Sequence, residues 1–217
     1  MIKIIEQTDS WLMINKPGGV SVHNDSSSVI DYFKSKGTLT APVHRIDKET
    51  SGLLLLSKNQ NDTAKLQAAL ADSKKSYLAI CRGKLDQDEG VWKDQLSDKA
   101  EGYKNPKGKK SELKDCMTSW KKLISNNYFT LILFQISTGR THQIRKHCAL
   151  HKLEILGDKR YGDSKYRKLI ASKYSFTGMA LHSYKLDITL DEKERSFVAE
   201  LPEYFEKLMG DSLEEHL

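Results

Sequence analysis

Short apolar runs separated by turn residues dominate the first third of the chain. Residues 2–5 and 11–14 are mostly apolar and flank Thr8-Asp9-Ser10, which predicts a β-hairpin that ends before Pro17. Residues 53–56 are four consecutive leucines without polar alternation, which predicts a strand buried on both faces in the middle of a sheet. Apolar residues at helical spacing predict helices over residues 28–36 and 61–72.

The rest of the chain continues this mixture of strands and helices. The further predicted elements are a strand over 77–81, paired strands over 114–122 and 128–136, a helix over 141–152, a hairpin of residues 178–190 with 196–199, and a helix over 202–209. Residues 86–113 are polar and have no clear period. Strands outnumber helices and come in pairs, so we expect an α+β fold around a mixed, mainly antiparallel sheet with flanking helices, forming one domain over residues 1–217.

Charge and cysteine content narrow the choice of partner and compartment. The net charge is +6 and the sequence pI is about 9.0, which is compatible with a polyanionic partner and equally with ordinary surface lysines. Residues 104–114 hold five lysines, which either follow phosphates or lie on a solvated loop. Three widely spaced cysteines, the lack of a signal-peptide pattern and the lack of an apolar stretch of roughly 20 residues predict a cytoplasmic protein.

The stretch HRIDKETSGLLLL, residues 44–56, crowds charged side chains before the leucine strand. A carboxylate at Asp47 lies on a tight turn beside a core, and a nearby arginine would keep it ionised and usable as a nucleophile. The alternative is that Asp47 and Thr50 only cap a turn before Gly52, which is a common role for these residue types.

A second polar cluster occupies residues 137–162, STGRTHQIRKHCALHKLEILGDKRYG. In a helix that starts at Thr141, Arg145 lies one turn further along the same face, and Arg140 lies near the start. An arginine of this cluster could pair with the aspartate of the first one. The alternative is a solvated amphipathic helix with Ile144 and Cys148 facing inward.

The histidines of this cluster raise the possibility of a zinc enzyme. His147 and His151 are four residues apart, and Cys148 and His142 are close in sequence. The HExxH pattern is absent, however, as are GxxxxGK[ST], GxGxxG and GxSxG. We therefore expect no metal at these residues.

Seven segments together resemble the motifs of the RluA-type pseudouridine synthases, in the order found in that family. They are NKPGGVSVH (15–23), HRIDKETSGLLLLSK (44–58), KSYLAICRG (75–83), KDCMTSW (114–120), TGRTHQIRKHCA (138–149), ILGDKRYG (155–162) and ALHSYKL (180–186). The resemblance implies an enzyme that converts uridine in structured RNA, tRNA or rRNA, to pseudouridine. It also implies the pseudouridine synthase catalytic fold with a central active-site cleft, and no metal or organic cofactor.

The resemblance also assigns roles to residues. It implies that Asp47 is the catalytic aspartate, that Arg145 is its ion-pair partner, and that Tyr77 stacks on the target base and assists proton transfer. It implies that Arg45 enters the RNA stack in place of the flipped base and that Ile144 helps to wall the base pocket. The matching motifs further place four residues among those that bind substrate: His44, Lys75, Arg140 and Thr141.

Some segments depart from the family pattern. Trp120 stands where a tyrosine is common, and residues 94–112 and 165–176 do not align with it. The catalytic pattern begins almost at Met1, without the accessory RNA-binding domain of many relatives, so we expect a monomer that recognises RNA through its catalytic domain. A non-catalytic RNA-binding or RNA-folding protein on the same scaffold is the alternative function.

Overall fold

The computed structural model describes residues 2–23, 25–210 and 213 and divides the chain into two compact units. The first unit comprises Met1–Ser76 and His182–Leu201, and the second comprises Tyr77–Leu181 and Pro202–Leu217. Strands β5 (Lys74–Arg82) and β9 (Leu181–Leu190) each cross the boundary between them. Whether the units act as the single domain predicted from the sequence stays a prediction.

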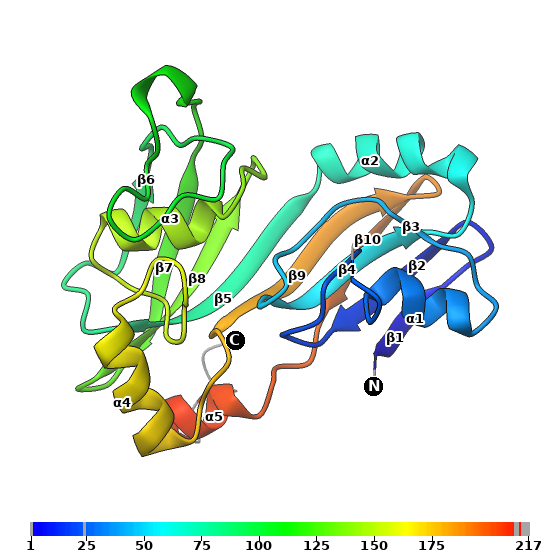
Figure 1. The fold of residues 1–217 in the computed structure, drawn as a ribbon. Coiled ribbons are helices and arrows are strands. Elements are labelled where there is room, and N and C mark those ends of the chain that lie inside the picture. The colour runs from blue at the N-terminus through cyan, green and yellow to red at the C-terminus, as the bar shows by residue number, and fades with distance from the viewer. Residues whose placement is uncertain (1, 24, 211–212, 214–217) are drawn as a thin grey trace. The chain divides into compact units, whose positions relative to one another are not determined.

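The first unit is a sheet with one helix on each face of its central strands (Figure 1). Its elements are β1 (Lys3–Gln7), β2 (Trp11–Lys16), α1 (Val29–Ser35), β3 (Ala41–Pro42), β4 (Ser51–Ser57), the 3-10 turn η1 (Gln60–Asp62), α2 (Thr63–Ala71), most of β9 and β10 (Lys193–Val198). The strand order is β1-β2-β4-β9-β10, and β3 pairs with β4. Only β4 and β9 run parallel; the other described pairs here are antiparallel, so the predicted mixed sheet is confirmed.

The four leucines of β4 are the centre of this unit. Leu53 and Leu55 pack with Leu66 and Leu70 of α2, whereas Leu54 and Leu56 pack in the cluster that contains Val29 and Phe33 of α1. Each of the four leucines is at most 1% exposed. A strand covered on both faces needs apolar residues at every position, which explains the uninterrupted run.

The second unit is a sheet whose strands are antiparallel where their register is described, with α3 against one face. Its elements are most of β5, β6 (Glu89–Trp92), η2 (Lys110–Glu112), β7 (Thr118–Ser125), β8 (Phe129–Ile136), α3 (Gln143–Leu150), α4 (Ser164–Tyr174) and α5 (Tyr204–Met209). The strand order is β5-β8-β7-β6. The core combines Ala79 and Cys81 of β5 with Trp120, Phe134 and Cys148.

Several predicted boundaries were wrong, and four elements were missed: β3, β6, η2 and α4. The strand predicted from residue 114 begins at Thr118, and the helix predicted from Thr141 begins at Gln143. The helix predicted over residues 28–36 spans Val29–Ser35 and buries Val29 and Phe33. Strand β6 and helix α4 lie in segments that showed no pattern, because each buries a single residue in a polar sequence.

Candidate functional site

Asp47 lies on a tight turn directly before β4, as predicted. The N–H of Thr50 donates a hydrogen bond to the carbonyl oxygen of Asp47 at 3.1 Å, and Thr50 is buried. The side chain of Asp47 is half-buried, whereas Lys48 between these residues is exposed. The turn therefore presents a carboxylate at the entrance to the most buried strand of the first unit.

The buried ammonium group of Lys16 forms hydrogen bonds to this turn and to the segment before it. Lys16 is 0% exposed, and its Nζ donates to the carbonyl oxygens of Pro17 (3.0 Å), Val20 (2.8 Å) and Lys48 (3.2 Å). Burial lowers the pKa of Lys16 to about 8, against the opposing charges of Asp47 and Glu49. The NKPGG segment thus anchors the Asp47 turn through a charge with three acceptors, a role that the sequence did not indicate.

Two close contacts hold the start of β4 in place. Gly52 has φ +106°, and a Cβ atom there would lie 2.2 Å from the carbonyl oxygen of Ser183 on β9. Next to it, the Oγ of Ser51 and the Nδ1 of His182 are hydrogen-bonded at 2.8 Å. Burial lowers the pKa of His182 to about 4, so this histidine is neutral at physiological pH. The turn is therefore fixed on its C-terminal side by backbone packing that only glycine permits.

The other predicted substrate-binding residues of the first unit have different environments. The Nε2 of His44 accepts the N–H of Leu55 at 3.1 Å, and burial, followed by the charge of Lys75, lowers the pKa of His44 to about 4. Arg45 is exposed, as expected for a side chain that contacts RNA. Lys75 donates to the carbonyl oxygen of Ser73 at 3.4 Å, and its pKa is lowered by burial. His44 thus holds a strand, whereas Arg45 is accessible.

Arg145 is buried in the second unit and forms a bidentate ion pair with Asp158. The Nε and Nη2 atoms of Arg145 lie 2.8 and 2.9 Å from the two carboxylate oxygens, and both side chains are at most 4% exposed. The same carboxylate accepts the N–H groups of Arg160 and Tyr161 at 2.9 and 3.0 Å. Burial alone would raise the pKa of Asp158, but the hydrogen bonds and charge of Arg145, together with these two N–H groups, lower it.

Asp158 was missed as a partner of Arg145, although its turn was noted in the sequence. The guanidinium also lies 5.2 Å from the ring centre of Tyr161, whose hydroxyl is 2.9 Å from the Nδ1 of His142. Asp158 and Tyr161 therefore fix the orientation of Arg145 within the second unit. The predicted pairing of Arg145 with Asp47 joins residues of different units and stays a prediction.

Tyr77 and Ile144 belong to one apolar cluster of the second unit. They are 8% and 4% exposed, respectively. Tyr77 comes from β5 and Ile144 from the first turn of α3, one residue before Arg145. The structure thus brings these two predicted residues into one environment, next to the predicted ion-pair residue.

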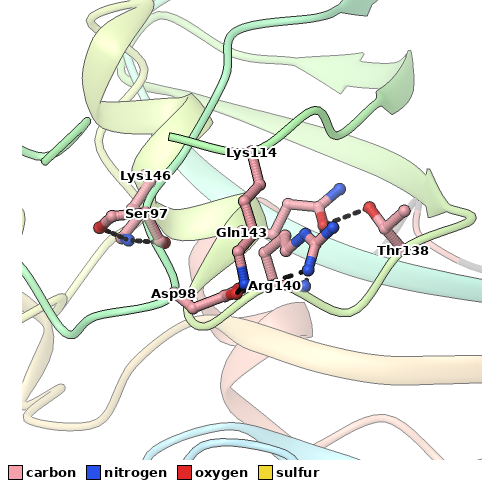
Figure 2. Close-up of polar contacts among 7 residues, drawn as sticks. All are labelled: Ser97, Asp98, Lys114, Thr138, Arg140, Gln143 and Lys146. Carbon is pink, nitrogen blue, oxygen red and sulfur yellow. Dashed lines mark hydrogen bonds and ion pairs between the residues drawn. The ribbon is translucent and has the colours of Figure 1, made fainter. Parts of the chain in front are cut away.

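The N-terminus of α3 differs from its predicted form. His142 adopts a left-handed conformation (φ 56°) before the helix, so Thr141 does not share a helix face with Arg145. Instead, the Oε1 of Gln143 accepts the N–H of Arg140 at 3.2 Å and the hydroxyl of Thr138 at 2.8 Å. Figure 2 shows Gln143 at the centre of these contacts. All residues from 143 to 148 are buried, so the helix is not solvated, although Ile144 and Cys148 face inward as that alternative expected.

A second buried lysine ties the polar segment after β6 to α3 (Figure 2). Lys146 is 0% exposed and donates to the carbonyl oxygens of Ser97 and Lys99, both at 2.7 Å. Asp98 between them accepts from Lys114 at 2.6 Å and from Arg140 at 3.4 Å. Burial lowers the pKa of Lys146. Residues 97–99 are therefore packed against the helix that carries Arg145.

The histidines and cysteines of α3 do not converge. His147 contacts the Oγ1 of Thr118 (2.8 Å) and the carbonyl oxygen of Asp94 (3.0 Å), whereas His151 contacts the carboxylate of Asp94 at 2.8 Å. Among the residues that the structure describes, no three His, Cys, Asp or Glu side chains are grouped to hold a metal ion. The geometry gives the zinc alternative no support.

In the same described ranges, no helix is long and apolar enough to cross a membrane.

Comparisons with known proteins show the family to which the chain belongs. The RNA pseudouridylate synthase family matches residues 10–150. The chain is 35% identical to ribosomal large subunit pseudouridine synthase C of Rickettsia bellii, over 94% of this chain and 70% of the relative. It is 34% identical to an RNA pseudouridine synthase of Zymomonas mobilis, over 91% and 92% of the two chains.

Solved structures show the same fold. Human RNA pseudouridylate synthase domain containing 1 superposes with a TM-score of 0.78 at 20% identity, covering 99% of this chain and 92% of the other. Human RNA pseudouridylate synthase domain containing 4 gives a TM-score of 0.77 at 24% identity, covering 94% and 90%. The conserved fold and the sequence matches lead to one conclusion: the chain belongs to the RNA pseudouridylate synthase family and is an isomerase that acts on RNA.

Proposed function

We propose that the chain isomerises uridine in ribosomal RNA of the large subunit, with Asp47 as the nucleophile. The observation that carries the assignment of Asp47 is its position on a turn with two supports. Lys16 donates to the carbonyl oxygen of Lys48 in this turn, and the turn leads directly into the buried strand β4. A catalytic carboxylate needs such support, because small displacements of a reacting group cost large factors in rate. The names of the Rickettsia relatives favour ribosomal RNA over the equally expected tRNA.

The proposed reaction begins with a flipped uridine, because a stacked base is out of reach of the carboxylate. Asp47 attacks C1′ of the ribose while the bond from C1′ to N1 breaks, and the electron pair of that bond leaves with the uracil. The uracil rotates, and a new bond forms from C5 to C1′ as the Asp47 carboxylate is released. The hydrogen on C5 is lost as a proton to solvent, and N1 gains a proton, so the product is an isomer of the substrate.

Five further residues have a role in this scheme. Tyr77 stacks on the uracil and assists the loss of the C5 proton, and Ile144 contributes an apolar wall. Arg145 stabilises the charged form of Asp47, and Asp158 orients Arg145. Arg45, which is exposed, replaces the flipped base in the RNA stack. The expectations of a monomer, of cytoplasmic location and of activity without a cofactor stay predictions.

Loss of tritium from RNA labelled at C5 of uridine tests this proposal directly. Protein-free ribosomal RNA, assembled large subunits and bulk tRNA serve as separate substrates. Release from either ribosomal substrate, without release from tRNA, supports the proposal. Release from tRNA alone would contradict the RNA class, and binding of all three substrates without release would favour the non-catalytic RNA-binding protein.

A further inference from the structure

Helix α4 is the most uniformly basic element of the second unit. Its sequence, SKYRKLIASKY, contains four basic residues and no acidic one. Lys165, Lys168 and Lys173 are exposed, and Ile170 is the buried residue of the helix. At about 1.5 Å and about 100° per residue, the three lysines span about 12 Å along the helix axis, and Lys168 and Lys173 lie about 140° apart around it. The solvent-exposed surface of α4 therefore carries three positive charges, spread around the helix.

The acidic side chains near α4 do not pair with these three lysines. Asp163 caps α4 by accepting the N–H groups of Lys165 and Tyr166 at 2.7 and 3.0 Å, and Glu154 accepts the N–H of Asp163 at 3.1 Å. Within the described part of the chain, the three exposed lysines of α4 have no carboxylate partner within ion-pair distance.

Aromatic rings accompany the charges. The Nζ of Lys173 lies 4.9 Å from the ring centre of Tyr128, which is 58% exposed. The guanidinium of Arg82 lies 4.0 Å from the ring centre of Tyr166 in the first turn of α4. Basic side chains interleaved with accessible rings are typical of surfaces that bind RNA strands.

Helix α4 is also connected to the residues that orient Arg145. It begins at Ser164, after the turn that contains Asp158 and Tyr161, and Arg167 of its first turn lies 3.5 Å from the carbonyl oxygen of Asp158. Its position in the second unit is shown in Figure 1. RNA held on α4 would therefore be bound to the same rigid segment that fixes Arg145.

We propose that the exposed surface of α4 that carries Lys165, Lys168 and Lys173 binds the phosphate backbone of the substrate RNA outside the target uridine. This inference rests on the proposed function, because it takes RNA as the substrate. An anionic membrane surface is less suited to this face, since Leu169 is its only exposed large apolar side chain. Residues 165–176 do not align with the family motifs, so the contact would belong to this chain's own mode of RNA recognition.

The test compares two triple variants that each remove three lysines. The first carries Lys165→Gln, Lys168→Gln and Lys173→Gln, which preserve helix propensity. The control replaces three exposed lysines of the first unit by glutamine: Lys34, Lys36 and Lys193. Both variants and the wild type are measured for binding to a fluorescein-labelled RNA hairpin across a range of salt concentrations, and for tritium release from ribosomal RNA.

The α4 variant should bind the hairpin at least about tenfold more weakly near 0.1 M salt, and its salt slope should be shallower by about three, one for each lost phosphate contact. For the α4 variant, KM for ribosomal RNA should rise more than kcat falls, whereas the control should match the wild type. A third variant, with arginine in place of Lys165, Lys168 and Lys173, should retain RNA binding. Equal binding and equal salt slopes for the two glutamine variants would overturn the proposal. So would loss of binding to phosphatidylserine vesicles with unchanged RNA binding.

The two proposals fail in different ways. If the wild type binds RNA through α4 but releases no tritium from any RNA, the isomerase proposal fails and the α4 proposal stands. If the wild type releases tritium and the α4 variant has an unchanged KM and salt slope, the α4 proposal fails alone.

Discussion

Replacement of Asp158 by asparagine should strongly destabilise the second unit. The variant keeps the size of the side chain but removes the charge that pairs with Arg145, and it sets an amide N–H₂ against one of the two guanidinium nitrogens. Both partners are at most 4% exposed, so water cannot replace the lost carboxylate. Removing one partner of a buried ion pair typically costs about 3–5 kcal/mol.

For a protein of this size, that loss corresponds to a fall in Tm of about 6–20 °C. Thermal unfolding followed by calorimetry and near-UV circular dichroism measures it. The pair also predicts a pH dependence. Because the pKa of Asp158 is lowered in the folded state, its contribution is complete above the carboxyl's usual pKa and is lost as the pH falls through the lowered value. The stability difference between wild type and variant should therefore shrink in acid.

Asp163→Asn is the matched control, because it makes the same chemical change five residues away. Asp163 is the N-cap of α4, and asparagine caps helices as well as aspartate does. This variant should unfold within a few tenths of a kcal/mol of the wild type. If Asp158→Asn were equally mild, the ion pair would not be the support of Arg145 that its geometry indicates.

Three further predictions test the supports of the Asp47 turn. Lys16→Met should destabilise the first unit by about 3–5 kcal/mol in urea unfolding, because it removes a buried charge that donates to three partly buried carbonyl groups; a loss below about 1 kcal/mol would contradict that. Gly52→Ala should prevent the close approach to Ser183 and cost more than Gly37→Ala, which has a similar positive φ but no atom within 4 Å of its Cβ position; equal unfolding energies would refute the steric argument. Because the pKa of His182 is lowered to about 4, this histidine should lower wild-type stability between pH 6.5 and 4 by up to about 1.4 kcal/mol per pH unit, and His182→Gln should reduce the slope of pH-dependent unfolding by that amount, with the contribution of His44 remaining.

The sequence predicted those features that depend on local pattern. The four leucines of β4 indicated a strand buried on both faces, and the turn before them indicated the position of Asp47. Both were confirmed because burial on two faces and tight turns impose residue types on neighbouring positions. The order of the motifs then supplied the family, which the comparisons confirm.

Other features were not predictable in this way. Helix α4 buries only Ile170, so its sequence carries no apolar period, and the left-handed His142 shifted the start of α3. The supporting contacts join distant positions: Lys16 reaches Lys48, and Lys146 reaches Ser97. No local pattern records such pairs, because a buried lysine with three carbonyl acceptors looks like any surface lysine in the sequence.

The most direct test of the central claim is single-turnover tritium release from ribosomal RNA by Asp47→Asn, with Glu49→Gln as control. Both variants remove one carboxylate charge from the same turn, so both change the surroundings of Lys16 in a similar way. Loss of all release with Asp47→Asn, and near wild-type release with Glu49→Gln, is the predicted result. Full release by the Asp47 variant would contradict the assignment of Asp47 as the nucleophile.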